Sequence, residues 1–315
     1  MNKLSIDFQK KFSDRLIFDK SVFARIDRSV KLHEETNRNP LSSSAACLNL
    51  IGALSNDPKG LMSYLNSFNL QLEEVLPFPA PAEVDGRLYN DTGYAVFEWV
   101  GPQTSPLLEI GGGRGQNRTS IDAYVLGKIA GKICQIFIEW KFTEGSSREL
   151  FLGKFSGGKG IERLRRYSTV LAGLRKRNAL PFAFSEEFQP GQPASALSLA
   201  DFSPDHLYQL MRMTLLAKTT TPIMVGDLSV SDYRILHLSH SANDKINRLY
   251  PKYLELSPGL SRFSDMDFHN VWRELLAEDE KSKFLSGYWD QSIPAIENEE
   301  LRNYLTSRYF VERFS

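Results

Sequence analysis

The sequence predicts an α/β fold whose core runs helix, three-strand antiparallel meander, helix, strand, with helical N- and C-terminal extensions. Three stretches rich in β-branched and aromatic residues, at 94–100, 120–126 and 133–142, follow one another with glycine-rich breaks between them, which is typical of strands joined by turns. Segments with apolar residues at helical spacing lie on both sides of this run. The order of elements predicts an N-terminal helical extension at 1–40, a core at 41–242 and a helical C-terminal extension at 243–315.

The composition is typical of a globular protein, with 42% hydrophobic and 24% charged residues in a chain of 315. The longest mostly apolar run, at 45–54, has about half the length of a membrane span. The first twelve residues contain no apolar signal core. These features predict a cytoplasmic protein that makes no membrane contact. Cys47 and Cys134 belong to no metal-binding motif and are expected to be inert core thiols.

Several helices are expected before the meander. The segment at 22–32 is mixed in polarity and the segment at 45–54 is apolar, and each predicts a helix. Pro40 and the serines at 42–44 precede the second of these and supply candidate N-caps. A further helix is expected near 60–68. Residues 77–91, rich in Pro, Ala and Asp, are expected to form a loop.

Helices also follow the meander. Apolar residues at 161, 164, 167, 171 and 174 fall at helical spacing, with the arginines mostly on other faces. Pro204 begins another helix at 205–218, and a strand follows at 233–238. The remainder is expected to be largely helical, most clearly at 268–276 and 300–310.

The third predicted strand carries two opposite charges within an apolar sequence. Because side chains alternate between the faces of a strand, Ile136, Ile138, Trp140 and Phe142 share one face, and Phe137, Glu139 and Lys141 share the other. A buried structural salt bridge would explain such a pair. A reaction centre would explain it equally.

The preceding strand favours the reaction centre. Ile121, Ala123 and Val125 are expected on one side, and Ser120, Asp122 and Tyr124 on the other. Antiparallel pairing of the two strands then brings Asp122 beside Glu139. Two adjacent carboxylates repel each other unless a cation lies between them, and hard oxygen ligands favour Mg²⁺. The peptide carbonyl of Trp140 is expected as a further metal ligand, and Lys141 as the group that positions water or stabilises charge on a phosphate oxygen.

The tripeptide alone is a weak signal. Three acid-x-Lys tripeptides occur in the chain, at 57–59, 139–141 and 279–281. The first contains a proline in a loop, and the last lies in a charged segment that is expected to be helical. Only the middle one lies on a strand of the buried type with an acid on the strand before it, which makes the combination moderately specific.

The pattern Thr119-Ser120-Ile121-Asp122, followed by Ile138-Glu139-Trp140-Lys141, resembles the Asp…Glu-x-Lys signature of PD-(D/E)XK nucleases. More closely, the chain resembles a family of bacterial restriction-endonuclease-like proteins, on four further segments. These are the segments at 43–50, 112–115, 208–212 and 237–244. The resemblance covers about two-thirds of the chain. It implies a restriction-endonuclease-like core and a catalytic triad of Asp122, Glu139 and Lys141, with Asp122, Glu139 and Trp140 as metal ligands.

One position departs from that superfamily. A second metal-supporting acid on the first helix is usual there, but the helix at 45–54 contains none, and Glu34 and Glu35 precede it. Glu98, on the first strand, is the expected substitute. The helix after the meander often presents a polar residue to the site in related nucleases, which makes Gln209 a second supporting candidate.

Net charge is zero, with 38 basic and 38 acidic residues, but its distribution is uneven. Residues 148–177 contain nine basic and two acidic residues, which predicts either a solvated helix face or a surface that tracks phosphates. The glycine cluster at 111–115 is either a flexible connection or a loop that permits close backbone approach to a ligand. The expected nucleic-acid contacts are Arg114, Arg118, Ser120, Lys159, Arg163 and Arg166.

The sequence therefore predicts a Mg²⁺-dependent endonuclease that cleaves DNA in restriction or defence, with Mn²⁺ as a substitute metal. Cleavage of both strands commonly uses two active sites, which favours a homodimer, and a partner protein of the defence system is also expected. The rival interpretation is a catalytically inactive nuclease-fold protein that binds nucleic acid or a protein partner. An enzyme that acts on small phosphate esters is a weaker alternative. The polar cluster at 237–244 is interpreted as a turn and helix cap.

Overall fold

The computed structural model describes residues 16–26, 39, 41–79, 83–84, 87–88, 92–111, 117–143, 153–184, 197–249, 257–264 and 266–309. The helical elements are η1 (Lys20–Arg25), α2 (Ser43–Cys47), the π-helical segment η3 (Leu48–Gly52), α3 (Pro58–Asn66), α4 (Gly157–Lys176), η6 (Leu199–Phe202), α5 (Asp205–Thr219), α6 (Asp244–Asn247), η7 (Pro258–Phe263), α8 (Phe268–Leu275), η8 (Glu278–Lys283), η9 (Ile293–Ala295) and α9 (Glu299–Tyr309). The strands are β1 (Glu74–Leu76), β2 (Glu83–Val84), β3 (Arg87–Leu88), β4 (Val96–Trp99), β5 (Ile121–Ile129), β6 (Lys132–Trp140), β7 (Ile223–Val225), β8 (Leu228–Val230), β9 (Asp232–Ser239) and β10 (Phe284–Tyr288).

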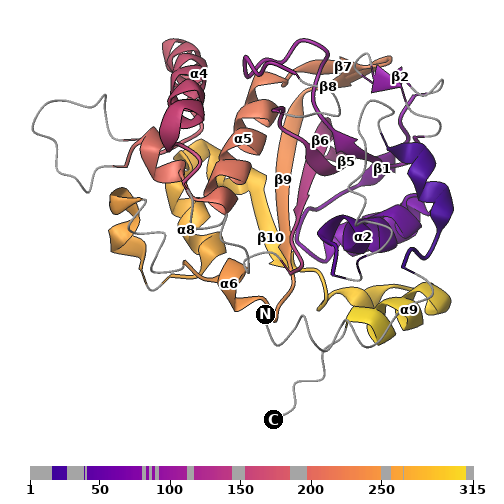
Figure 1. Ribbon diagram of the computed structural model, residues 1–315. Coiled ribbons are helices and arrows are strands. Elements are labelled where there is room, and N and C mark those ends of the chain that lie inside the picture. The colour runs from indigo at the N-terminus through magenta and orange to yellow at the C-terminus, as the bar shows by residue number, and fades with distance from the viewer. Residues whose placement is uncertain are drawn as a thin grey trace, which may run out of the picture.

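A six-stranded mixed sheet forms the centre of the molecule (Figure 1). Its order is β1-β5-β6-β9-β10, and β4 pairs with β5 along the same edge as β1. The β4–β5 and β5–β6 pairs are antiparallel, which confirms the predicted meander. Ala130 and Gly131 form the tight β5–β6 turn with φ of 48° and 74°, the region that two-residue hairpin loops need. Strands β9 and β10 then continue the sheet parallel to β6.

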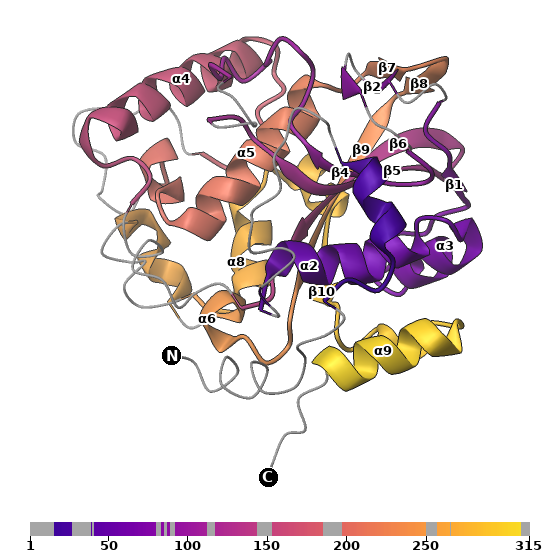
Figure 2. The same cartoon turned by 45° about the vertical axis from the view of Figure 1, so that its right-hand side comes forward.

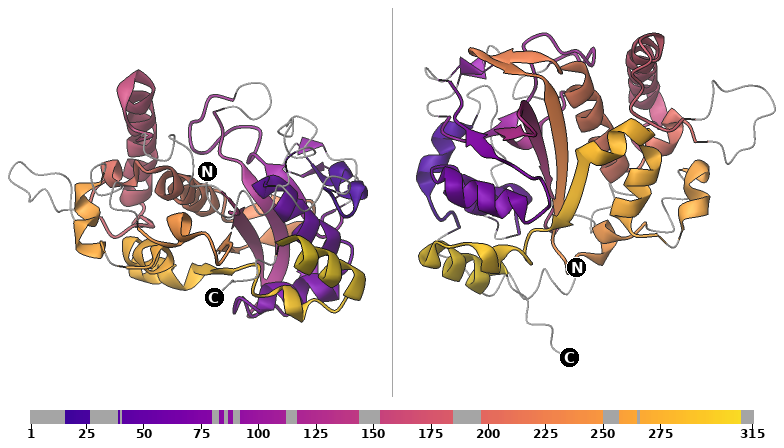
Figure 3. Two further views of the ribbon diagram at one scale, coloured as in Figure 1. Left: turned by 60° about the horizontal axis from the view of Figure 1, so that its bottom comes forward. Right: turned by 180° about the vertical axis from the view of Figure 1, so that it is seen from behind.

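Helices cover both faces of this sheet (Figure 2). One face packs against α2, α3 and α9, and the other against α4, α5 and α8; Figure 3 shows the two layers from below and from behind. The apolar side chains form two separate clusters, one on each face. Because strand side chains alternate, Phe137 contributes to the α5 side, while Ile136 and Ile138 contribute to the α2 side.

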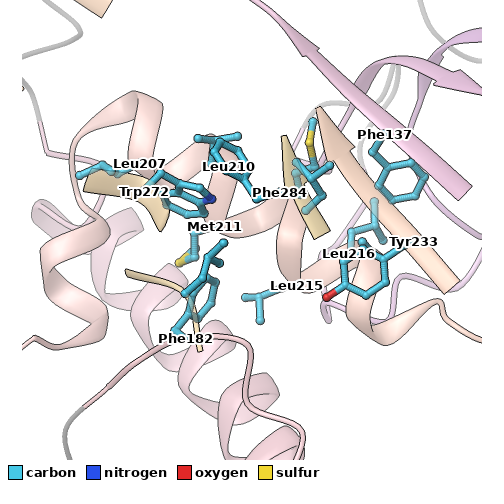
Figure 4. Close-up of a cluster of buried hydrophobic side chains, with 14 of the residues drawn as sticks. Phe137, Phe182, Leu207, Leu210, Met211, Leu215, Leu216, Tyr233, Trp272 and Phe284 are labelled. Atoms are coloured by element: carbon cyan, nitrogen blue, oxygen red, sulfur yellow. The ribbon is translucent and has the colours of Figure 1, made fainter. Parts of the chain in front are cut away.

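The core on the α5 side is rich in aromatic rings (Figure 4). Its centre is built from Phe137, Phe182, Leu207, Leu210, Met211, Leu215, Leu216, Tyr233, Trp272 and Phe284, all buried. The α5 members recur every three to five residues, which is the spacing that keeps a helical face on the sheet. This packing fixes α5 against β6 and β9, next to the end of β6 where the predicted reaction centre lies.

The C-terminal region differs from the prediction. It was expected to be largely helical, but β10 at 284–288 joins the central sheet as its edge strand. Only five residues long and containing Gly287, β10 carries too little periodicity to be recognised in sequence. The short hairpins β2–β3, inside the expected loop at 77–91, and β7–β8 also went unpredicted. On α4, Ile161 is 60% exposed rather than on the core face, since the packed face begins at Tyr167.

The strand alternation breaks beside the predicted site, which corrects one expectation. Ile121 was expected on the same side as Ala123, yet it packs with Tyr124 in the α5-side cluster. On β4 the same break lies at Glu98, whose φ is 55°. The register pairs Phe97 with Ala123 and Trp99 with Ile121, and Glu98 lies between these two pairs. A local irregularity of this kind turns side chains away from the regular pleat.

Candidate active site

The antiparallel pairing of β5 and β6 brings the two predicted carboxylates together. The ladder runs to Ala123 opposite Ile138, so Asp122 and Glu139 are the next residues along the two strands. Burial raises the pKa of the Asp122 carboxyl well above its usual range, and the Glu139 and Glu98 carboxylates raise it further. Lys141 and a backbone N–H oppose this shift only in part. This is the electrostatic signature of acids crowded into one place.

Lys141 forms an ion pair with Glu139, with 2.7 Å between Nζ and Oε1. The two side chains are only 8% and 7% exposed. Desolvation of such a pair costs free energy that mutual attraction offsets only in part, so the pair is weak evidence of a stabilising role. Its position beside Asp122 favours the catalytic interpretation over the structural one.

Backbone and side-chain hydrogen bonds orient the acids. The N–H of Trp140 donates to Asp122 Oδ2 at 2.7 Å, which ties the carboxylate to the end of β6. Ser120 donates to Glu98 Oε2 at 2.9 Å. The predicted nucleic-acid contact Ser120, just before β5, and the predicted supporting acid Glu98, on β4, are thus hydrogen-bonded to each other.

Three successive carbonyls at the end of β6 each accept a hydrogen bond from a side chain of a different segment. The Ser43 hydroxyl donates to the carbonyl of Trp140 at 3.0 Å. The Trp289 indole N–H donates to the carbonyl of Lys141 at 2.9 Å, and the Asn243 amide donates to the carbonyl of Phe142 at 2.8 Å. We call these three side chains the carbonyl clamp. Since the donors come from α2, from the turn after β10 and from the segment before α6, the clamp fixes the chain at Lys141 from three directions.

The clamp gives a structural role to segments whose function the sequence did not reveal. Ser43 lies in the segment at 43–50 and Asn243 in the segment at 237–244, both of which carry the family resemblance. Asn243 also precedes α6, so the predicted turn is present, but its side chain contacts β6 instead of capping the helix. Trp289 offered no sequence signal, because a lone buried tryptophan is more often a packing residue.

A small cavity of about 10 Å³ lies between α2 and the acids, lined by Ser44, Cys47, Leu48, Phe97, Glu98 and Asp122. Burial raises the pKa of the Cys47 thiol well above its ordinary value, and the Asp122, Glu98 and Glu139 carboxylates raise it further. The thiol therefore stays protonated at neutral pH and is neither a thiolate ligand nor a nucleophile.

Several predicted nucleic-acid residues lie on α4 and on the connection before β5. Lys159 is exposed, and Arg166 is half-buried. Arg163 donates to the carbonyl of Lys154 at 2.8 Å. Arg118 donates to the carbonyls of Pro102 and Gln103. These bonds hold the end of the β4–β5 connection against the start of the same connection.

The predicted contact Arg114, the acids that precede the first helix and the supporting candidate Gln209 remain to be placed. Arg114, Glu34 and Glu35 lie outside the described residues. The Gln209 amide lies 3.5 Å from Asp205 Oδ1, and in the described part of the chain its Oε1 has no hydrogen-bond partner.

A buried network around Glu109 was missed by the sequence analysis. Its carboxylate accepts hydrogen bonds from the backbone and hydroxyl of Thr119 at 2.8 and 2.7 Å and from the Tyr167 hydroxyl at 2.9 Å. Arg212 completes it with an ion pair of 3.2 Å. The network joins α4 and α5 to the start of β5, three residues before Asp122. Arg212, one turn beyond Tyr208 on α5, is therefore connected to the residues that precede β5.

The buried histidines beside the site remain neutral. His237 Nδ1 lies 2.9 Å from His269 Nε2, and burial, followed by His269 and Lys141, lowers the pKa of His237 well below its ordinary value. Burial similarly lowers the pKa of His206 to about 3. Because these rings are neutral, they add no positive charge that would compete with Lys141 for the ion pair with Glu139.

Asp122, Glu139 and the carbonyl of Trp140 fit a hard divalent cation in part. Two carboxylates and one carbonyl are oxygen donors of the type that Mg²⁺ prefers, and Mg²⁺ keeps several waters as its remaining ligands. Burial, and then the neighbouring carboxylates, raise the pKa of Asp122, and a bound cation would favour its charged form. Within the described ranges, no three His, Cys, Asp or Glu side chains are close enough to hold a metal by themselves, so water or substrate would have to supply the other ligands.

A comparison with known families identifies the family of the chain. The model of the family described as "Restriction Endonuclease associating with ARP" matches residues 10–310. The chain belongs to this family. No curated protein and no solved structure matches the chain significantly. Membership of this family implies a phosphodiester hydrolase with a role in defence. None of the helices in the described part of the chain is both long enough and apolar enough to cross a bilayer.

Proposed function

We propose that this chain is a metal-dependent endonuclease that hydrolyses phosphodiester bonds in DNA, within a restriction or other defence system. The observation that carries the proposal is the buried Glu139–Lys141 pair next to Asp122, whose pKa is raised by burial and by its acidic neighbours. Crowded acids beside a buried lysine lower the stability of a protein, and functional sites are where such arrangements accumulate. The family description supports the same class of reaction.

Asp122, Glu139 and the carbonyl of Trp140 would hold Mg²⁺, with Mn²⁺ as a substitute. Bound there, the cation would polarise the phosphate and lower the pKa of the attacking water. Lys141 would stabilise the negative charge that develops on the phosphate oxygens, and the low exposure of its side chain strengthens that interaction. The carbonyl clamp would hold Lys141 in one position as charge develops, so that little reorganisation is required.

The basic side of the molecule suits a polyanionic substrate. Lys159, Arg165, Arg175 and Lys176 are exposed on α4, and Arg177 is exposed at its C-cap. Exposed cations concentrated on one helix bind phosphates through release of counterions, with affinity that falls steeply with salt. This distribution favours long nucleic acid over a small phosphate ester as the substrate. The association with ARP in the family description supports a protein partner as well.

The test is cleavage of supercoiled plasmid by wild type and Lys141→Ala, with and without Mg²⁺ or Mn²⁺. Lys281→Ala is a matched control, because Lys281 also ends an acid-x-Lys tripeptide but forms an exposed ion pair with Glu278 at 2.8 Å. We expect metal-dependent nicking or linearisation that Lys141→Ala abolishes and Lys281→Ala retains. Equal cleavage by wild type and Lys141→Ala would show the assignment of the reaction centre to be wrong.

One observation favours the rival proposal of a catalytically inactive binding protein. The first helix presents Ser43 to the site, where its hydroxyl already contacts the carbonyl of Trp140, and contains no acid. Calorimetric titration with Mg²⁺ separates the two proposals. Binding that Asp122→Asn abolishes supports the nuclease, and the absence of metal binding by well-folded wild type supports the inactive protein.

A further inference from the structure

Two apolar side chains extend into solvent from the connection between β4 and β5. Leu108 is 53% exposed and Ile110 is 78% exposed, the largest value among the exposed large hydrophobic residues of the described chain. Their neighbours alternate with them, since Leu107 is 0% exposed and Glu109 is 7% exposed. Exposed apolar side chains are common singly. A pair fixed on either side of a buried acid requires a more specific explanation.

The segment that carries them is rigidly held. Glu109 accepts hydrogen bonds from Thr119 and Tyr167 and pairs with Arg212. The N–H of Leu108 donates to the carbonyl of Ser105 at 3.1 Å. Leu108 itself has φ of 59°, a conformation that costs a branched residue about 1 kcal/mol or more. A buried network thus maintains a strained backbone that directs Leu108 and Ile110 outward.

The segment is also coupled to the reaction centre. Thr119, which donates twice to Glu109, lies three residues before Asp122 on the same stretch of chain. Tyr167 connects Glu109 to α4, whose basic residues form the proposed phosphate-binding face. The two apolar side chains are therefore fixed relative to both the acids and the cations that would contact a DNA substrate.

We propose that Leu108 and Ile110 form a wedge that inserts between stacked bases of the DNA duplex and opens it beside the scissile phosphate. The proposal rests on the proposed nuclease function. Proteins that kink or unstack DNA commonly insert one or two apolar side chains, such as Leu or Ile, between base steps. A protein partner fits less well, because two side chains are a small fraction of the roughly 800 Å² that each partner buries in a standard interface. The surrounding charge on α4 is positive, as a DNA ligand requires.

The test measures unwinding of DNA without knowledge of the recognition sequence. Nicked circular plasmid is ligated in the presence of Lys141→Ala protein, which prevents cleavage, and the linking number is read after the protein is removed. The same measurement is made with Leu108→Ser and Ile110→Ser added together to that background. Met224→Ser in the same background is the control, because Met224 is 56% exposed on the separate β7–β8 hairpin. Far-UV circular dichroism checks that each variant folds, and fluorescence anisotropy measures DNA binding.

We expect negative supercoils with the Lys141→Ala protein and the Met224→Ser control, and their loss in the Leu108→Ser, Ile110→Ser variant at concentrations that saturate the DNA. The wedge proposal is overturned if the bound Lys141→Ala protein leaves the linking number unchanged, or if supercoils persist with the double variant. In either case, plasmid cleavage by wild type leaves the nuclease proposal standing. An altered sedimentation coefficient of the double variant without altered unwinding assigns these residues to self-association and also overturns the wedge. Wild type that neither cleaves nor binds DNA overturns both proposals, and cleavage by wild type distinguishes the two failures.

Discussion

The carbonyl clamp makes a quantitative prediction at Trp289. Trp289→Phe retains an aromatic ring but removes the indole N–H that donates to the carbonyl of Lys141. Trp272→Phe is the matched control, because Trp272 is equally buried at 0% exposure and its N–H has no partner within the described residues. Both substitutions remove the same atoms from an aromatic core. Only one of them leaves a buried carbonyl without its donor.

The difference between the two variants isolates the hydrogen bond. A buried carbonyl without a partner costs about 1–3 kcal/mol, whereas loss of an unpartnered N–H removes a destabilising group. We therefore expect Trp289→Phe to lower the free energy of unfolding by about 1–3 kcal/mol more than Trp272→Phe does. In a protein of this size, each kcal/mol corresponds to roughly 2–4 °C or less in Tm.

The assay is urea unfolding followed by circular dichroism, combined with plasmid cleavage at a temperature where both variants are folded. We expect cleavage by Trp289→Phe to fall well below that of Trp272→Phe, because the chain at Lys141 is less firmly held. If the two variants lose the same free energy of unfolding, the hydrogen bond to the carbonyl of Lys141 contributes nothing, and the reasoning about the clamp is refuted.

Three further predictions concern the acids and their neighbours. Because the pKa of Asp122 is raised in the folded protein, the folded protein binds this proton more tightly than the unfolded chain, and stability falls as pH rises from about 4 through the folded pKa. In differential scanning fluorimetry, Asp122→Asn should therefore raise Tm at neutral pH, by an amount that vanishes toward pH 4. An unchanged or lower Tm at pH 7 contradicts this. Lys141→Met should lower the free energy of unfolding in urea by about 3–5 kcal/mol, because it leaves Glu139 charged and buried. Adding Glu139→Gln should restore most of that free energy. Strictly additive losses in the double variant would show that the pair is not coupled. Ser43→Ala should lower the free energy of unfolding by about 1 kcal/mol and weaken metal binding or cleavage less than tenfold. A complete loss of metal binding in calorimetry would instead show that the hydroxyl positions a metal ligand.

The closeness of the two candidate acids could be predicted because consecutive strands joined by a short turn pair side by side. Asp122, Glu139 and Lys141 were assigned to one face from the residues around them, and the β5–β6 register brings the two carboxylates together. The position of Ile121 could not be predicted, because the break at Glu98 depends on a backbone conformation with positive φ that no residue type at that position announces. Glutamate is not among the residues that usually adopt it.

Contacts between distant segments were beyond the sequence for a different reason. Ser43, Asn243 and Trp289 converge on the carbonyls of three successive residues, and each belongs to an element whose local pattern is satisfied by packing alone. Parallel pairing of β9 and β10 with β6 brings these elements together. Such long-range order emerges from tertiary structure and leaves no periodic signal in a single sequence. The catalytic role of the site residues stays a prediction that the proposed experiments test.

The origin of the clamp has a consequence for how the protein is made. Synthesis begins at the N-terminus, and domains fold as their residues emerge from the ribosome. Asp122, Glu139 and Lys141 emerge early, but the side chain that holds the carbonyl of Lys141 belongs to residue 289. A nascent or prematurely terminated chain that ends before residue 284 lacks both this side chain and the edge strand β10. If the proposed nuclease function is correct, we expect an unfinished chain of this kind to cleave DNA poorly, because the carbonyl of Lys141 lacks its indole donor.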